Sequence, residues 1–172
     1  MNKTLKILYL TREMYPNNRA LLSELWNNEL SKRGHKITWV MQPEKASDYT
    51  KVTKWGESRL YLVRNSKRNN LYSKFISSIY RFSDKYYTIY EILNNEEFDI
   101  IQVRNGIFES FIAMYFAKKK NIVFSFHLSS MHGYHDKEIY SKEFKGFILF
   151  LKNFFRLFIP MFYTYIIKHA NI

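Results

Sequence analysis

Residues 98–127 read FDIIQVRNGIFESFIAMYFAKKKNIVFSFH, two short apolar runs separated by a longer amphipathic one. The short runs, Phe98–Val103 and Ile122–Phe126, have the length and composition of buried strands. Residues 108–120 have the spacing of a helix, with its larger apolar side chains on one side: Phe111, Ile112, Tyr115 and Phe116. A strand, a helix of ten or more residues and another strand predict two parallel strands joined by a crossover helix.

The same alternation extends over the rest of the chain. Further strands are expected at residues 5–10, 36–41 and 58–63, and helices at 19–33 and 70–95. Gly34 follows Lys32 and Arg33, as expected for a helix end with a left-handed cap. A second long helical region is expected from residue 137 to the end, broken near Pro160. The pattern predicts an α/β fold, a doubly wound, mostly parallel sheet with helices on both faces.

The chain has 172 residues, which suits one domain. Residues 169–172 have the pattern of a helix end followed by the start of a sixth strand. We therefore expect residues 1–172 to form one domain that is truncated before its last strand, as half of a larger protein.

Composition excludes some chemistry and favours anionic partners. Cysteine is absent, which excludes disulfides, thiolate metal sites and cysteine nucleophiles. Lys and Arg number 27 against 15 acidic residues, a net charge of +12. Such a surface attracts nucleic acid, phosphorylated small molecules or anionic lipid headgroups. The first residues, MNKTLKILYL, lack the features of a signal peptide, so a cytoplasmic location is expected.

In parallel sheets, ligands bind at the carboxyl ends of the strands, which directs attention to loops 11–18, 104–107 and 127–136. Loop 11–18 contains no glycine, so the dinucleotide-binding fingerprint is absent and an NAD-binding domain is disfavoured. The helix after it still offers free N–H groups and a positive dipole end to an anion. Arg12 or Arg19 can add charge there, or both can be ordinary solvated loop residues.

Two strand ends carry further candidate residues. Arg104 and Asn105 end one strand, where a side chain faces a ligand, although Asn105-Gly106 can also mark only a tight turn. His127 follows the apolar run 122–126 directly. It can hold a sugar or phosphate oxygen or move a proton, unless it is a core histidine with a satisfied hydrogen bond.

A metal site is not expected in loop 127–136. His132 and His135 follow His127 at steps of five and three, which matches no helical pair of ligands. The nearby acids, Asp136 and Glu138, do not complete a ligand set, so His132 and His135 are interpreted as structural.

Two basic segments suggest a surface for anions. Residues 141–159 are apolar over most of a helical circumference, with a narrow stripe formed by Lys145, Lys152 and Arg156. Such a helix can lie in a membrane interface or be wedged against a partner domain. Residues 51–74 carry seven cations and one acid. Without an RNA-binding signature, this second segment is interpreted as a solvated or membrane-facing surface and not as a nucleic-acid site.

The order of these segments resembles the N-terminal domain of GT-B glycosyltransferases of glycosyltransferase family 4. The resemblance covers nearly the whole chain and rests on five segments: KILYLTREMYP (6–16), LWNNELSKRGHKITWV (25–40), FDIIQVRNGIF (98–108), IVFSFHLSSMHG (122–133) and YTYIIKHANI (163–172). It implies a Rossmann-like domain that forms one half of a GT-B fold and binds the acceptor. A second, C-terminal half, absent from this sequence, would hold most of the nucleotide-sugar donor.

The resemblance also assigns roles to residues. It makes His127 the catalytic histidine, in contact with the transferred sugar or the acceptor, and Arg104, Asn105 and Ser129 the substrate-binding residues. The donor's diphosphate would lie near Asn17, Asn18 and Arg19. Family members often carry a Gly-Gly pair where this chain has Asn17-Asn18, and bulkier residues restrict the approach of phosphate to the backbone.

The expected activity is transfer of a hexose from a nucleotide sugar to a lipid-linked or cell-envelope glycan acceptor, with no metal and no cofactor. The isolated chain is expected to be inactive, because the donor-binding groups lie in the missing half. The family and the charge together favour peripheral attachment to the anionic inner face of the membrane. The alternative is a non-catalytic, membrane-docking subunit of a split glycosyltransferase.

Overall fold

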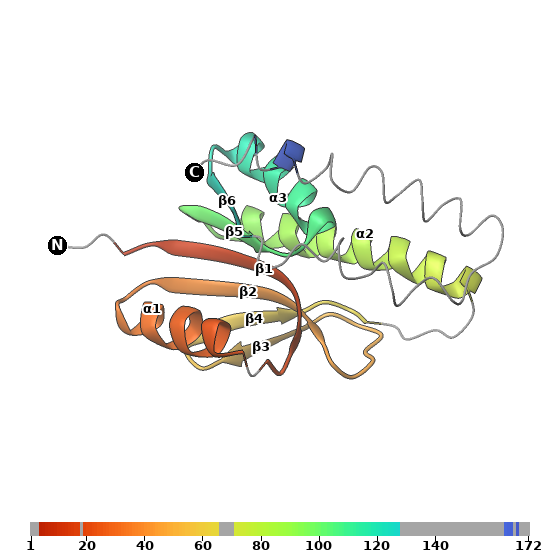
Figure 1. The fold of residues 1–172 in the computed structure, drawn as a ribbon, viewed down its shortest axis with the longest axis horizontal. Coiled ribbons are helices and arrows are strands. Elements are labelled where there is room, and N and C mark those ends of the chain that lie inside the picture. Colours follow the sequence, from red (N-terminus) through yellow and green to blue (C-terminus); the bar gives the residue numbers. More distant parts are fainter. Residues whose placement is uncertain (1–3, 18, 66–70, 128–163, 167, 169–172) are drawn as a thin grey trace.

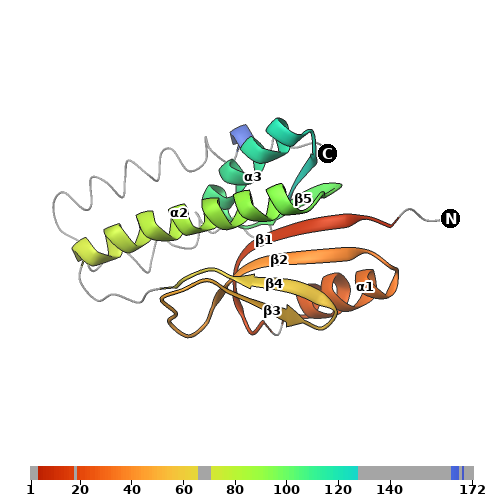
Figure 2. The same ribbon diagram turned by 180° about the vertical axis from the view of Figure 1, so that it is seen from behind.

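The computed structural model describes residues 4–17, 19–65, 71–127, 164–166 and 168 (Figures 1 and 2). In this part of the chain, six strands form one sheet in the order β3-β4-β2-β1-β5-β6. The strands are β1 (Lys6–Tyr15), β2 (Lys36–Pro43), β3 (Lys51–Trp55), β4 (Ser58–Leu62), β5 (Ile100–Arg104) and β6 (Val123–His127). All neighbours pair in parallel except β3, which is antiparallel to β4. The prediction of a mostly parallel sheet is confirmed.

Helices cover both faces of the sheet (Figures 1 and 2). The described helices are η1 (Leu21–Glu29), a π-helix that continues into α1 (Leu30–Lys32), then α2 (Leu71–Asn95) and α3 (Ile107–Lys120). Apolar residues of α2 and α3 form one core with the sheet, and Leu22 of η1 belongs to a second core with Trp39 and Leu60. The sheet is therefore doubly wound, as predicted.

The apolar run in β1 is explained by its place between these two cores. Leu8 and Leu10 belong to the core under α2 and α3, and Tyr9 belongs to the core under η1. Successive side chains of a strand point to opposite faces, so a strand covered on both sides needs apolar residues at nearly every position.

The predicted helix end at Gly34 is confirmed. Gly34 has a φ of +86°, a left-handed conformation that glycine adopts without steric cost. Its N–H donates to the carbonyl of Ser31 at 2.9 Å, and the N–H of His35 donates to that of Leu30 at 3.0 Å. These bonds satisfy helix-end carbonyls and turn the chain into β2.

Two strands differ from the prediction. β1 does not end at Leu10 but continues to Tyr15, after an irregularity in its pairing with β2 between Leu10 and Met14. β3 (Lys51–Trp55) was not expected as a strand, because its lysines made this segment look like a charged surface. It is an edge strand of the sheet, where exposed lysines are common because they discourage pairing with other chains.

The C-terminal prediction is tested only in a few positions. Residues 164–166 are helical, and Ile166 is fully buried in the core under α2 and α3. The rest of the expected helical region from residue 137, and the strand start at 169–172, lie outside the described residues.

Candidate functional site

Three polar residues lie side by side where β5 and β6 end and where the pairing of β1 with β5 ends. Thr11 pairs with Arg104, and Arg104 pairs with His127, in neighbouring parallel strands. Parallel strands end at the same edge of a sheet, and this edge is where ligands bind in folds of this class. The predicted residues Arg104 and His127 are therefore neighbours at the expected edge.

These residues belong to a polar strip on one face of the sheet. Ile101, Val103 and Phe124 belong to the core under α2 and α3. By strand alternation, Gln102, Arg104 and His127 lie on the opposite face. Gln102 and Arg104 are nevertheless buried. Buried faces of parallel sheets are usually apolar, so polar side chains here require a specific reason.

Arg104 is the most unusual of these residues. It is 5% exposed, and its Nε and Nη1 atoms are buried without a hydrogen-bond partner in the described part of the structure. A buried charged group that lacks hydrogen bonds costs more than an unpaired neutral group. Unpaired buried donors of this kind are rare in folded proteins and need an explanation, of which a functional role is one.

The Tyr9 hydroxyl is close to this guanidinium. Burial raises the pKa of Tyr9 to about 12, although the positive charge of Arg104 acts to lower it. The hydroxyl is buried and, like Arg104 Nε and Nη1, has no partner of good hydrogen-bond geometry in the described structure. Tyr9 is thus protonated at neutral pH and adds a further hydrogen-bond donor beside Arg104.

His127 is half-buried at the last position of β6. Burial lowers the pKa of His127 below the ordinary value of 6.5, and the charge of Arg104 lowers it further. The imidazole is therefore neutral near pH 7, with one nitrogen able to accept a hydrogen bond. The His127 carbonyl accepts the N–H of Asn105 at 3.1 Å, which ties the ends of β5 and β6 together.

The turn after β5 differs from a simple Asn-Gly turn. Asn105, not Gly106, has the left-handed conformation, with a φ of +57°. Gly106 is extended and caps α3. A Cβ atom at Gly106 would lie 2.5 Å from Oε2 of Glu109, so the close approach of this carboxylate requires glycine.

Sequence reasoning missed an ion pair beside this turn. Nζ of Lys85 in α2 donates to Oε1 of Glu109 in the first turn of α3, and both residues are buried. Burial acts to raise the pKa of Glu109, but Lys85 and, more weakly, Arg12 hold it below its ordinary value. The pair joins residues 24 positions apart, and no local motif marks it.

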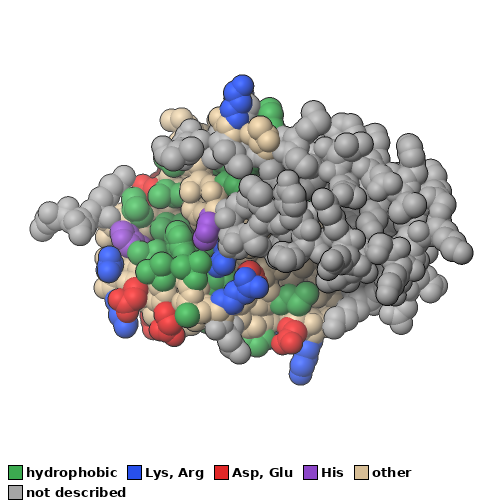
Figure 3. All heavy atoms as spheres, viewed as in Figure 1, with side chains coloured by type: hydrophobic (Ala, Val, Ile, Leu, Met, Phe, Trp, Pro, Cys, Tyr) green, Lys and Arg blue, Asp and Glu red, His purple; other side chains and the backbone are tan. Residues whose placement is uncertain are grey.

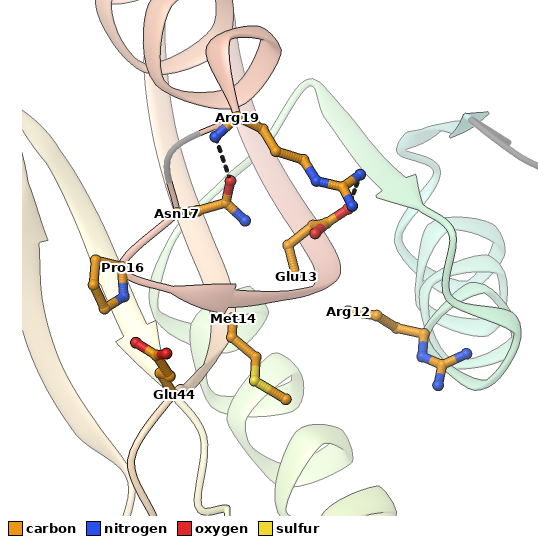
Figure 4. A pocket seen from close by; sticks show the side chains of 7 residues that line it. All are labelled: Arg12, Glu13, Met14, Pro16, Asn17, Arg19 and Glu44. Carbon is orange, nitrogen blue, oxygen red and sulfur yellow. Dashed lines mark hydrogen bonds and ion pairs between the residues drawn. The ribbon is translucent and has the colours of Figure 1, made fainter.

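The loop after β1 forms a separate, open pocket of about 600 Å³ (Figure 4). It is lined by Arg12, Glu13, Met14, Pro16, Asn17, Arg19 and Glu44. The Arg19 guanidinium is bound to Glu13 at 2.9 Å, and the Arg19 backbone N–H donates to Oδ1 of Asn17 at 2.9 Å. The structure therefore brings the predicted residues Asn17 and Arg19 together, apart from Arg104 and His127, which do not line this pocket.

Other predicted residues cannot be placed. Asn18, Ser129, Lys145, Lys152 and Arg156 lie outside the described residues. Within the described part, no three His, Asp or Glu side chains are close enough to hold a metal ion. No helix among the described residues is long and apolar enough to cross a membrane.

The second basic segment, residues 51–74, is partly neutralised. Arg59 is paired with Glu96, and Arg64 with Asp84 at 2.7 Å.

On the molecular face seen in Figure 3, cations and acids are mixed around an apolar area. The described part of that face is therefore not a uniformly basic surface.

Comparisons with known proteins match the fold. No family model and no curated protein matches the chain. Among solved structures it is similar to CalG4, the calicheamicin glycosyltransferase, with a TM-score of 0.52 and 15% identity, over 75% of this chain and 33% of that chain.

Two further structures are similar at lower scores. The catalytic domain of starch synthase IV from Arabidopsis thaliana has a TM-score of 0.49 and 13% identity, over 73% of this chain and 34% of that chain. The α,α-trehalose 6-phosphate synthase from Burkholderia multivorans has a TM-score of 0.44 and 8% identity, over 74% of this chain and 33% of that chain. The chain thus spans about a third of the length of the structures it matches. The likeness to CalG4 confirms the predicted fold class, a Rossmann-like α/β sheet.

Proposed function

We propose that this chain is the acceptor-binding, N-terminal half of a GT-B glycosyltransferase of the family 4 type. In this proposal it helps to move a sugar from a nucleotide-sugar donor to a lipid-linked or cell-envelope glycan. One observation supports it above all. A buried arginine, whose donors lack partners among the described residues, lies in register with a neutral histidine at the ligand-binding edge of a fold shared with a glycosyltransferase.

His127 is the proposed catalytic residue. A neutral imidazole at a strand end can accept a hydrogen bond from a hydroxyl of the transferred sugar or of the acceptor. Arg104, Asn105 and Ser129 are the proposed substrate-binding residues around it. The bond from the Asn105 N–H to the His127 carbonyl supports this role, because it fixes the backbone of His127 against β5.

The loop after β1 is the proposed contact to the donor's diphosphate, through Asn17, Asn18 and Arg19. The backbone N–H of Arg19 is already satisfied by Asn17, so the Arg19 guanidinium is the better candidate. That side chain is 57% exposed and can reach a ligand, and binding a diphosphate would replace its ion pair with Glu13. Most of the donor would be held by a second half, outside these residues.

A sugar-transfer assay tests the proposal. Labelled UDP-, GDP- and ADP-sugars are incubated with a membrane lipid extract and this chain, alone or joined to the C-terminal half that the proposal requires. Transfer is expected only when both halves are present, and His127→Ala should lower its rate by about 100-fold. Transfer by the 172 residues alone, or an unchanged rate in the variant, would contradict the proposal.

The second candidate is a non-catalytic, membrane-docking subunit of a split glycosyltransferase, which the net charge of +12 favours. The same assay separates the two. In a docking subunit, His127→Ala leaves the rate of the assembled enzyme unchanged. Replacement of Lys145, Lys152 and Arg156 by glutamine would instead lower the rate on membrane-bound acceptor.

A further inference from the structure

Cations at the carboxyl edge of the sheet differ in how their charge is balanced. Arg19 is bound to Glu13, and Lys85 to Glu109. Arg104 is buried as deeply as Lys85, yet no ion pair to it occurs among the described residues. Folding has therefore buried a positive charge for which the described part of the chain supplies no carboxylate partner.

The groups around Arg104 determine which kind of ligand can compensate its positive charge. The Tyr9 hydroxyl lies beside the Arg104 guanidinium. Among the described residues, neither this hydroxyl nor Nε and Nη1 of Arg104 makes a hydrogen bond of good geometry. Glu13 acts electrostatically on Tyr9, but it is bound to Arg19 at 2.9 Å. The cluster thus presents several donors, and a neutral sugar hydroxyl would leave the charge of Arg104 uncompensated. An oxyanion supplies both the acceptor atoms and the opposite charge.

From this we infer that Arg104 and Tyr9 bind an oxyanion carried by the acceptor, a phosphate or carboxylate group, so the acceptor is an anionic sugar and not a neutral glycan. The inference rests on the proposed function, because it takes this edge as the acceptor site. The register of Arg104 with His127 then places the anionic group close to the proposed catalytic histidine.

Binding of small anions to the complete 172-residue chain tests the inference without a donor. The probes are inorganic phosphate, glycerol 3-phosphate, glycerate and glycerol, titrated while the Nε–H resonance of Arg104 is followed by NMR. Phosphate and glycerol 3-phosphate should shift this resonance with saturation, and glycerol should not. Saturation by glycerate as well as by the phosphates would mean that carboxylates are accepted, and saturation by glycerate alone would assign the site to a carboxylate.

Variants identify the residues responsible, with binding followed by calorimetry and folding by circular dichroism. Arg104→Gln should weaken binding of the anion at least about tenfold, and Tyr9→Phe severalfold. Arg104→Lys keeps the charge and should bind with intermediate affinity, which guards against an Arg104→Gln variant that fails to fold. Arg59→Gln removes one positive charge near the amino end of β4, where Arg59 pairs with Thr38, and should have no effect.

Two outcomes would overturn the inference: no perturbation of Arg104 by any anion, or equal weakening by Arg104→Gln and Arg59→Gln. Failure of the proposed function gives a different result. If anions bind at Arg104 but the two joined halves transfer no sugar, the anion site stands and the transferase proposal falls. If sugar is transferred to a neutral acceptor at the same rate after Arg104→Gln, the transferase stands and the anion site falls.

Discussion

His127 ends β6 in register with a buried arginine, so its protonation reports on that charge. Burial and Arg104 both oppose the imidazolium, and we expect a titration midpoint below 6.5 for His127, followed by its imidazole NMR signals. Arg104→Gln should move the midpoint upward, because the second cause is removed.

Arg59→Gln is the matched control for this titration and should leave the midpoint unchanged. The lowered pKa of His127 also makes the stability of the folded chain depend on pH. Between the lowered pKa and 6.5 the unfolded chain binds more protons at this position, so the contribution of His127 favours the unfolded state as the pH falls through that window. A midpoint at or above 6.5 would contradict the assigned environment.

At the level of residues, candidate site residues can be predicted from the sequence when they directly follow an apolar run, at the end of a strand. His127 and Arg104 each follow an apolar run, and the alternation rule places both at the same edge. Tyr9 was not found, because within an apolar strand a tyrosine is indistinguishable from a core residue. Tyr9 contributes to the site only through its place beside Arg104 of the neighbouring strand β5. No local sequence pattern specifies the register between β1 and β5.

One buried ion pair, Lys85 with Glu109, joins α2 to α3 in addition to their apolar contacts. Glu109→Gln leaves the Lys85 ammonium buried without a counter-charge and should lower the free energy of unfolding by about 3 kcal/mol. The double variant Lys85→Met with Glu109→Met removes both charges at similar volume, and most of the loss should be recovered. Urea denaturation of the single and double variants measures both effects.

The control for this pair is Glu96→Gln, which breaks the exposed pair with Arg59 and should cost less than about 1 kcal/mol. The pH dependence gives a second check. The pKa of Glu109 is held below its ordinary value of 4.5, so its stabilisation is complete above that value and is lost as the pH falls through the lowered pKa. If the double variant is as unstable as Glu109→Gln, the instability does not come from the unpaired charge of Lys85, and the prediction is wrong.

At the level of elements, alternation predicted the parallel strands well and the edge hairpin poorly. β2 is a nearly continuous apolar run, since it is covered on both faces, and β5 is apolar except for Gln102 and Arg104. In β3 only Thr53 and Trp55 are half-buried, so no apolar run marks the strand. The extension of β1 to Tyr15 was missed for a related reason, because Thr11 to Glu13 are polar but still extended.

On the scale of the whole molecule, the net charge of +12 favours attachment to an anionic surface. Arg59 and Arg64 in segment 51–74 are paired with acids, so this segment is less basic than its composition suggests. The stripe Lys145, Lys152 and Arg156, outside the described residues, is therefore the better candidate for a membrane surface. Juxtamembrane cations contribute about 1 kcal/mol each to binding of anionic lipid.

We expect the chain to bind vesicles that contain anionic phospholipid, to be released as salt is raised, and to bind single-stranded DNA far more weakly. Replacement of the three stripe cations by glutamine should reduce vesicle binding by about 100-fold, from about 1 kcal/mol per charge. The control replaces Lys51, Lys54 and Arg59, which removes the same charge from β3 and β4. Because the attraction of each cation to the membrane falls off within a Debye length, cations that do not face the membrane contribute little, and that control should lose little. Equal losses in the two triple variants would show that total charge, not the stripe, attaches the chain to the membrane.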